Sequence, residues 1–164
     1  EDKPDPRFIA IETQAIDRVL WVPCFRHRFG KEMAPFADRL AMCRLAAGAL
    51  GDRVSVSDVE AALDDGRTLH LLEEIQRRQP EAHLRLAVGS DILAETSSWW
   101  RWSDVVALAP PIVIGRAGYP SDGLVELPAV SSSEIRARLG QGRGVEGLVS
   151  SSVLAYIHAQ RLYA

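Results

Sequence analysis

The chain has 164 residues, and its apolar fraction of 47% and charged fraction of 25% are those of an ordinary folded globular protein. This length is typical of one domain that buries a proper core. The formal net charge of −3 argues against a protein that binds nucleic acid through a strongly basic surface. A local basic pocket for a phosphorylated small molecule remains compatible with this charge.

The cysteines, histidines and apolar runs exclude several other classes. Cys24 and Cys43 are too few and too far apart for a disulfide framework or a zinc site, which favours two reduced thiols. His70, His83 and His158 lack the spacing of a metal site, so no metal held by side chains is expected. No apolar run approaches membrane-spanning length, and the polar start EDKPDPRF does not resemble a signal peptide. We therefore expect a cytoplasmic protein without a membrane partner.

Short aliphatic runs alternate with longer amphipathic stretches along the chain. The pattern predicts strands at 18–24, 52–58, 84–91, 111–116 and 123–128. It predicts helices at 34–50, 68–80, 132–139 and 151–163, with two shorter helical pieces across 91–98 and 99–109. Strands separated by helices indicate βαβ units. We therefore predict an α/β fold with a doubly wound, Rossmann-like, mainly parallel sheet in a single domain, 1–164.

Polar stretches with glycines or serines follow four of the expected strands. These stretches are 23–31, 89–91, 115–118 and 128–133. In open α/β sheets, ligands bind outside the carboxyl ends of the strands. We therefore expect these stretches to line one edge of the molecule.

The sequence GSD at 89–91 follows the third expected strand. Gly89 would let the backbone turn sharply and approach a ligand closely. Asp91 would either accept hydrogen bonds from ribose hydroxyls or cap the following helix. The sequence leaves both roles of Asp91 open.

Three serines directly precede the helix expected at 132–139 in the segment VSSSEIR. In a structural interpretation, Ser131 caps the helix while Glu134 reaches back to the cap amide, which is a capping box. In a functional interpretation, the N–H groups of the helix start, the serine hydroxyls and Arg136 form a cradle for phosphate. The two interpretations are compatible.

The segment SSWWRW at 97–102 holds three of the four tryptophans. On a helix, Trp99 and Trp102 would share a face while Trp100 points elsewhere. At least one indole would then be partly exposed or line a cleft, where it could stack on a flat heteroaromatic ring. The alternative is that all three indoles simply pack inside the protein.

Two further stretches have both a structural and a functional interpretation. The basic loop CFRHRFGK contains His27 and Lys31, which suits a phosphate but is also compatible with a solvated charged turn. Thr68 either caps the helix expected at 68–80 or presents its hydroxyl and amide to a ligand.

Taken in chain order, these segments resemble the nicotinate-nucleotide adenylyltransferases of the nucleotidyltransferase α/β superfamily. The matching segments are VLWVPC with its basic loop, APFADRLAMC, GRTLHLL, VGSDILAETSSWWRW, VSSSEIR and VLAYIHAQRLY. Related adenylyl- and cytidylyltransferases share the serine-rich motif, but the ordered set is fairly specific. It runs from about Val19 to the end of the chain.

The resemblance implies adenylyl transfer from ATP to nicotinate mononucleotide, which gives nicotinate adenine dinucleotide and pyrophosphate in NAD biosynthesis, with Mg²⁺ accompanying ATP. It implies that ATP is bound by Gly89, Asp91, Ser132, Ser133 and Arg136. It implies that the second substrate is bound by Thr68, Trp99, Lys31 and His27. In this arrangement Trp99 stacks on the nicotinate ring, and Lys31 and His27 meet a phosphate. No residue of the sequence receives a catalytic role, and the oligomeric state stays open, with a homodimer as one alternative.

The sequence departs from this family at its start. The family opens with a strand and a glycine-rich loop of the type G-x-F-x-P-x-H-x-G-H, whose histidines bind the ATP phosphates. The segment EDKPDPRF contains neither histidine nor glycine, so we expect this strand and loop to be absent from 1–164. Two alternatives therefore stand beside the enzyme: a non-catalytic nucleotide-binding relative, and a nucleotidyltransferase that acts on another phosphorylated small molecule.

Overall fold

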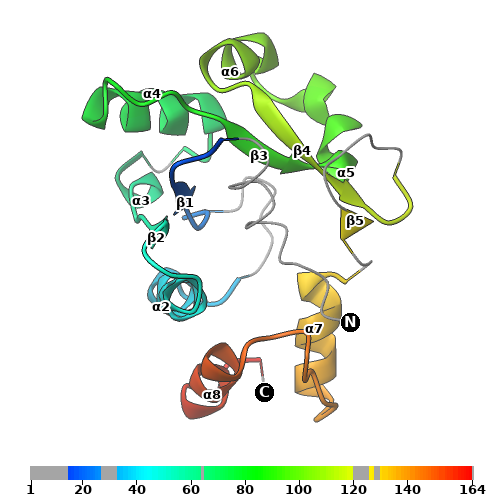
Figure 1. Cartoon of the computed structure of the whole chain (residues 1–164). Coiled ribbons are helices and arrows are strands. Elements are labelled where there is room, and N and C mark those ends of the chain that lie inside the picture. The colour runs from blue at the N-terminus through cyan, green and yellow to red at the C-terminus, as the bar shows by residue number, and fades with distance from the viewer. Residues whose placement is uncertain (1–14, 27–32, 64, 120–125, 128–129, 164) are drawn as a thin grey trace. The chain divides into compact units, whose positions relative to one another are not determined.

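The structure is a computed structural model (Figure 1), and the residues that it describes are 15–26, 33–63, 65–119, 126–127 and 130–163. Contacts within the chain group into two compact units, and each unit is described by itself. The first unit comprises residues 1–19 and 59–129, and the second comprises residues 20–58 and 130–164.

The first unit is built on a three-stranded sheet with the strand order β3–β4–β5. The strands are β3 (Leu86–Gly89), β4 (Pro111–Arg116) and β5 (Glu126–Leu127). Both pairs are parallel, with Leu86 opposite Pro111 and Gly115 opposite Glu126. Parallel neighbours need a crossover connection, and the helical segments between β3 and β4 supply it. The predicted parallel pairing is confirmed.

Short helices precede β3 and separate β3 from β4 along the chain. They are α3 (Glu60–Leu63), α4 (Thr68–Arg78), α5 (Ser90–Leu93), the 3₁₀ helix η1 (Thr96–Ser98) and α6 (Trp102–Leu108). The prediction for α4 is confirmed within two residues at its end, where Pro80 prevents continuation. Helix α3 was not predicted from the sequence, because one helical turn is too short to show an apolar period.

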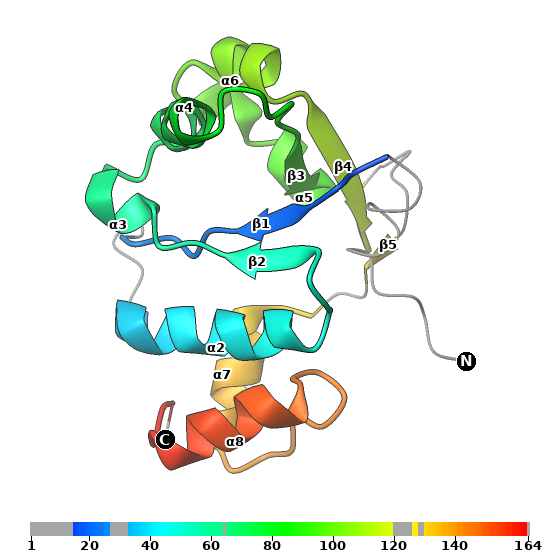
Figure 2. The ribbon, with the colours of Figure 1, turned by 60° about the vertical axis from the view of Figure 1, so that its left-hand side comes forward.

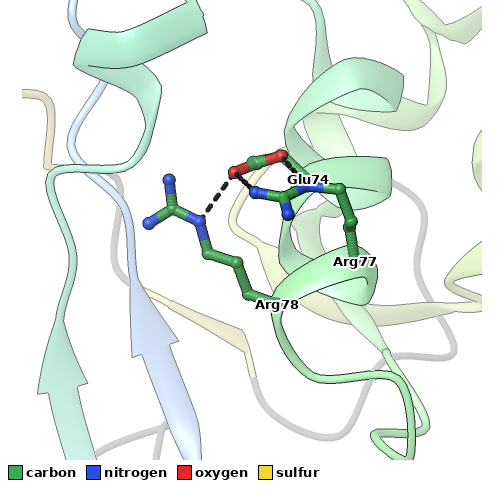
Figure 3. A network of polar contacts seen from close by, with 3 residues as sticks. All are labelled: Glu74, Arg77 and Arg78. Atoms are coloured by element: carbon green, nitrogen blue, oxygen red, sulfur yellow. Dashed lines mark hydrogen bonds and ion pairs between the residues drawn. The ribbon is translucent and has the colours of Figure 1, made fainter.

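The core of the first unit lies between α4 and α6. Its buried cluster consists of Leu69, Leu72, Val105 and Ala109. The two leucines are three positions apart and therefore share one face of α4. On the surface of α4, the carboxylate of Glu74 pairs with Arg77 and Arg78 (Figure 3). This apolar face and charged surface explain why the segment forms an amphipathic helix.

The second unit contains the two-stranded sheet β1–β2 and three helices. The strands are β1 (Val19–Trp21, whose first residue belongs to the first unit) and β2 (Val54–Val56). The helices are α2 (Phe36–Gly48), α7 (Ser132–Gly140) and α8 (Ser151–Ala159). Figure 2 shows α2 running beside β2, with α8 packed against α2. The Tyr156 hydroxyl of α8 donates to Oδ1 of Asp38 on α2 at 2.8 Å, which links the two helices.

Two expectations drawn from composition can be compared with this structure. Cys24 follows β1 and Cys43 lies in α2, and neither forms a disulfide, as predicted. Burial raises the pKa of the Cys43 thiol, although the nearby Arg39 opposes this shift. Within the described part of the chain, no helix combines the length and the apolar character needed to cross a membrane.

Candidate functional site

Two residues that follow β3 hold the end of β4. Ser90 is 3% exposed, and its Oγ accepts a hydrogen bond from the backbone N–H of Arg116 at 2.9 Å. Oδ2 of Asp91 accepts a hydrogen bond from Nη1 of Arg116 at 3.1 Å. The stretches after β3 and β4 therefore lie side by side, as the sequence predicted for the carboxyl ends of parallel strands. The other two stretches of the predicted edge belong to the second unit or lie outside the described residues, so their place at this edge stays a prediction.

Gly89 is required for space rather than for its backbone angles. Its φ of −71° and ψ of 151° are extended values that any residue adopts, so the passage from β3 to α5 does not require glycine for its backbone angles. The close approach of Gly89 to a ligand stays a prediction. A Cβ at this position would collide with Oδ1 of Asp91 and would lie 3.1 Å from Cδ of Arg116. The absence of a side chain therefore makes room for the ion pair between Asp91 and Arg116.

Asp91 does not cap the helix that follows β3. Gly89 occupies the N-cap position of α5, and no side chain caps that helix. The carboxylate turns to Arg116 instead, and its Oδ1 is buried without a hydrogen-bond partner in the described part of the chain. The guanidinium of Arg116 therefore compensates the charge of Asp91. The capping alternative is wrong, and contact with a ribose stays a prediction.

The tryptophan segment is not a continuous helix. Trp99 is extended, Arg101 is left-handed with a φ of 53°, and α6 begins only at Trp102. The rings of Trp99 and Trp102 nevertheless meet edge to face, with centroids 5.3 Å apart. The predicted proximity of Trp99 and Trp102 is therefore present. It arises from the left-handed turn at Arg101 and not from a continuous helix.

The three indoles of this segment differ in what they contact. All three are half-buried, which confirms the expectation of a partly exposed indole. Trp100 and Trp102 pack against the core cluster around Val105. Trp99 packs against Trp102, so it lies further from this cluster and keeps part of its surface open.

Thr68 is the first residue of α4 and does not cap it. The N-cap position belongs to Arg67, and no side chain caps the helix. Among the residues that the structure describes, none forms a hydrogen bond with the Thr68 hydroxyl. The capping alternative is therefore wrong for Thr68, and its hydroxyl is free for a ligand.

A cluster of four side chains joins the start of α4 to the tryptophan segment. The Arg67 guanidinium lies 4.4 Å from the ring centroid of Trp100, and His70 meets the same ring edge-on at 5.0 Å. Oδ1 of Asp65 accepts the backbone N–H of Arg67 at 2.9 Å, while its Oδ2 contacts Nδ1 of His70. Burial acts to raise the pKa of Asp65, but these hydrogen bonds and the nearby charges of His70 and Arg67 together lower it. The cluster brings Arg67, which precedes Thr68 in the sequence, together with Trp100, which follows Trp99.

The start of α7 has the predicted cap. Ser131 is the N-cap, and its Oγ accepts the backbone N–H of Glu134 at 3.1 Å. The Glu134 carboxylate does not return to the cap amide, because it accepts a hydrogen bond from Arg138 at 2.8 Å. The first half of the capping box is confirmed, and the second half is wrong because an arginine four residues further on competes for the carboxylate.

Arg136 folds back over the first turn of α7. Its Nε donates to the carbonyl oxygen of Ser132 at 3.0 Å, and its Nη2 donates to Oγ of Ser133 at 3.3 Å. The side chain also lines a cavity of about 440 Å³ within the second unit, together with residues 33–35 and 161–163. The serines and the arginine of the predicted cradle therefore do lie together.

Arg39 of α2 holds both ends of the basic loop. Its Nε donates to the carbonyl oxygen of Ala34 at 2.9 Å, and its Nη2 donates to that of Phe25 at 3.0 Å. Nη1 contacts the carbonyl oxygen of Cys24. The predicted ligand-binding residues of this loop, His27 and Lys31, lie outside the described residues.

Three arginines were missed as candidate site residues in the sequence. Arg67 and Arg116 both lie in stretches that the sequence singled out, and a basic residue beside a predicted ligand contact is a usable signal. Arg39 offers no such signal, because its partners are backbone carbonyls 14 and 15 residues away in an irregular loop.

Comparison with known proteins identifies the family. The chain matches the cytidylyltransferase-like family over residues 13–138. It is 52% identical over 158 residues to a probable nicotinate-nucleotide adenylyltransferase of Anaeromyxobacter dehalogenans (strain 2CP-C), covering 94% of this chain and 84% of the relative. A probable nicotinate-nucleotide adenylyltransferase of Myxococcus xanthus (strain DK1622) is 33% identical, with 92% of this chain and 81% of the relative covered.

Solved structures agree on the fold. Plasmodium falciparum nicotinic acid mononucleotide adenylyltransferase complexed with NaAD gives a TM-score of 0.79 at 19% identity, covering 96% of this chain and 88% of that chain. A putative nicotinate-nucleotide adenylyltransferase from Vibrio parahaemolyticus gives 0.68 at 20% identity, covering 96% of this chain and 85% of that chain. The predicted Rossmann-like α/β class is thereby confirmed. The chain belongs to the cytidylyltransferase-like family and, within it, to the nicotinate-nucleotide adenylyltransferases.

Proposed function

We propose that the chain transfers the adenylyl group of ATP to nicotinate mononucleotide, giving nicotinate adenine dinucleotide and pyrophosphate in NAD biosynthesis. The observation that supports this most directly is the 52% identity to a probable nicotinate-nucleotide adenylyltransferase over 94% of the chain. The side chains at the starts of α4 and α7 provide groups that could bind the two substrates.

Adenylyl transfer does not need a covalent nucleophile on the protein. A phosphate oxygen of nicotinate mononucleotide attacks the α-phosphorus of ATP, and the bond from that phosphorus to the pyrophosphate oxygen breaks. The protein contributes by aligning the two substrates and by neutralising negative charge. Hydrogen-bond donors and cations are therefore the groups to look for.

The start of α7 offers such groups for the ATP phosphates. Backbone N–H groups of a helix's first turn have no partners inside the helix and attract anions. Ser132 and Ser133 add hydroxyls, and the guanidinium of Arg136 lies over the same turn. Arg136 also lines the cavity of about 440 Å³, where Arg161 adds a second cation. We assign these residues to the phosphates of ATP.

At the end of β3, Gly89 and Asp91 are assigned to the nucleotide as well. The Asp91 carboxylate is fixed by Arg116, and the bare backbone of Gly89 gives that carboxylate its place. A fixed carboxylate is a suitable acceptor for ribose hydroxyls, because it loses little freedom when the ligand binds.

The second substrate is assigned to the start of α4 and the tryptophan segment. Trp99 would stack on the nicotinate ring through its open surface, and Thr68 would meet the ring's carboxylate through its free hydroxyl. Lys31 and His27, from the loop that Arg39 holds at both ends, are assigned to the phosphate.

Mg²⁺ is proposed to arrive with ATP rather than as a resident ion. The described residues contain no group of three or more His, Cys, Asp or Glu that could hold a metal. The carboxylate of Asp91 is already engaged by Arg116. Because Mg²⁺ is commonly held by substrate phosphates and few carboxylates, these residues fit an ion bound to the triphosphate. Such an ion would neutralise part of the phosphate charge.

The two free cysteines support a reducing, cytoplasmic compartment as part of this proposal.

The test is a pyrophosphate-release assay on the purified full-length protein with ATP, Mg²⁺ and nicotinate mononucleotide. We expect pyrophosphate and nicotinate adenine dinucleotide in equal amounts, the latter identified by its mass. Binding of ATP without release of pyrophosphate would contradict the proposal and favour a non-catalytic nucleotide-binding protein. Turnover with another phosphorylated acceptor, but none with nicotinate mononucleotide, would assign a different substrate.

A further inference from the structure

The guanidinium of Arg39 binds backbone carbonyl groups from two separate stretches of the chain. Its Nε donates to the carbonyl oxygen of Ala34 at 2.9 Å, and its Nη2 donates to that of Phe25 at 3.0 Å. Nη1 contacts the carbonyl oxygen of Cys24. A planar guanidinium presents its N–H donors in fixed directions, so it can hold several acceptors at set positions. Arg39 therefore determines how the backbone at the start of the basic loop is oriented.

Two aromatic rings fix Arg39 and the start of the loop to α2. The guanidinium lies 5.3 Å from the ring centroid of Phe36, the first residue of α2. Phe25 meets the same ring edge to face, with centroids 4.9 Å apart. The side chain of Arg39 is half-buried among these groups, all of which belong to the second unit. It therefore has little freedom to leave the carbonyls that it holds.

The bonds to Arg39 also set the direction of two backbone N–H groups. The described peptide bonds are all trans, and the N–H and C=O of a planar trans peptide point in opposite directions. Because the carbonyls of Cys24 and Phe25 face Arg39, the N–H groups of Phe25 and Arg26 face away from it. No residue in the described part of the chain accepts a hydrogen bond from the N–H of Phe25. Successive backbone N–H groups that face one side are suited to bind an anion.

The charge around these N–H groups also favours an anion. The Arg26 guanidinium lies 5.8 Å from the ring centroid of Phe25. The carbonyl oxygen of Arg26 accepts a hydrogen bond from Sγ of Cys24 at 3.0 Å, which fixes the next peptide as well. The sequence from Val19 to Lys31 contains four basic side chains besides the N–H groups and no aspartate or glutamate.

We propose that Arg39 is a positioning residue for the phosphate of nicotinate mononucleotide, because it aims the N–H groups of Phe25 and Arg26 at that phosphate. This inference rests on the proposed function. Arg39 does not touch the substrate itself, since all three of its nitrogen atoms bond backbone carbonyls. A phosphate oxygen is the attacking atom of the reaction, so its placement affects the rate as well as the affinity.

The experiment compares Arg39→Met and Arg39→Lys with the wild type. Methionine keeps an apolar stem beside Phe36 but removes every donor, whereas lysine keeps the charge but loses the planar fork. Arg44→Met is the matched control, because Arg44 is exposed on the same helix. For each protein, the Kd is measured by isothermal titration calorimetry for nicotinate mononucleotide, for nicotinate riboside, which lacks the phosphate, and for ATP. The Tm is measured in parallel.

We expect Arg39→Met to weaken the binding of nicotinate mononucleotide by about ten- to a hundredfold, the range for lost hydrogen bonds to a charged group. The binding of nicotinate riboside and of ATP should change little, so the variant loses its preference for the phosphorylated ligand. Arg39→Lys should keep an intermediate preference, and Arg44→Met should behave like the wild type.

An equal loss for nicotinate mononucleotide and its riboside in Arg39→Met would overturn the proposal, because a packing role alone gives that result. An unchanged preference would overturn it too, as would a loss confined to ATP. If Arg39→Met does not fold, the preferences of Arg39→Lys and Arg39→Gln decide in the same way.

The wild type separates this inference from the proposed function. A wild type that binds nicotinate mononucleotide and ATP but releases no pyrophosphate would overturn the proposed function, while the binding data still decide the role of Arg39. Normal wild-type turnover with an unaltered preference in the variants would overturn only the role of Arg39. A wild type that does not bind nicotinate mononucleotide would overturn both.

Discussion

The end of β3 and the start of α7 are both assigned to the nucleotide, yet they are built in opposite ways. At the end of β3, Ser90 and Asp91 bond to Arg116, which lies 26 and 25 residues further along the chain. At the start of α7, every hydrogen bond of Ser131 and Arg136 given above joins residues three or four positions apart. The first region is thus held by hydrogen bonds between distant residues, and the hydrogen bonds described for the second lie within one helix.

This difference predicts that substitutions in one region affect stability and that substitutions in the other affect ligand binding. Ser90 is buried, and the carboxylate of Asp91 is three-quarters covered, so changes at the end of β3 should disturb the folding of the first unit. The residues at the start of α7 are exposed or half-buried, so changes there should affect a bound anion more than the fold. Variants in each region can test whether the separation holds.

The largest effect is expected for Arg136→Ala at the start of α7. ATP affinity, measured by isothermal titration calorimetry, should fall by about 1.5–3 kcal/mol, the range for a hydrogen bond to a charged group. The Tm should hardly change, because the two hydrogen bonds described for Arg136 lie within its own helix and its side chain is only half-buried. Arg138→Ala on the same helix is the control and should leave ATP affinity intact, since Arg138 pairs with Glu134. An unaltered affinity in Arg136→Ala would reduce the serines to a helix cap.

Gly89→Ala should have the next largest effect, and this effect should be on folding. The new Cβ would displace the Asp91 carboxylate from Arg116, and overpacking of this kind costs about 1–3 kcal/mol of unfolding free energy. The measurement is urea-induced unfolding. Gly48→Ala is the control, because a Cβ at that helical glycine meets nothing within 4 Å and alanine is the better helix former. Equal stability of Gly89→Ala and the wild type would show that Asp91 is not fixed in solution.

Ser131→Ala tests the local construction of α7 directly. Loss of the cap to the Glu134 amide should cost about 1 kcal/mol of unfolding free energy. Ser131→Asp retains an oxygen acceptor and should restore most of that loss. If Asp and Ala at this position are equally destabilising, the cap does not contribute to stability.

The same contrast explains what the sequence could predict. The predicted cap of α7 is confirmed, because a pattern of four residues encodes it. The predicted bounds of β4 are confirmed as well, because an aliphatic run that starts at a proline marks them. The pairing of Asp91 with Arg116 depends on the register of two parallel strands, which no local pattern encodes. The left-handed turn at Arg101 was missed for a related reason, because nothing in SSWWRW marks a positive φ. The strand pairing and one helix cap were therefore predictable from clear patterns, and the particular side-chain pairs between elements were not.

The smallest effect is expected at a local network in the first unit, the pairing of Glu74 with Arg77 and Arg78 (Figure 3). Hydrogen bonds from the two arginines lower the pKa of Glu74 from its ordinary 4.5 to about 2. Because the folded pKa lies below the unfolded one, the stabilising contribution is complete above pH 4.5 and is lost as the pH falls towards about 2. Near neutral pH, titration of this group should therefore cause no change of stability with pH.

Carbon-detected NMR titration of the Glu74 carboxyl measures this directly. Its midpoint should be about 2 in the wild type and should move back towards 4.5 when Arg77 and Arg78 are both replaced by methionine. The Tm of the double variant at neutral pH should stay close to that of the wild type, because ion pairs at the protein surface contribute little. A large loss of stability would show that contacts within one helix also hold the unit together. The contrast between the end of β3 and the start of α7 would then reflect burial rather than the separation of partners along the chain.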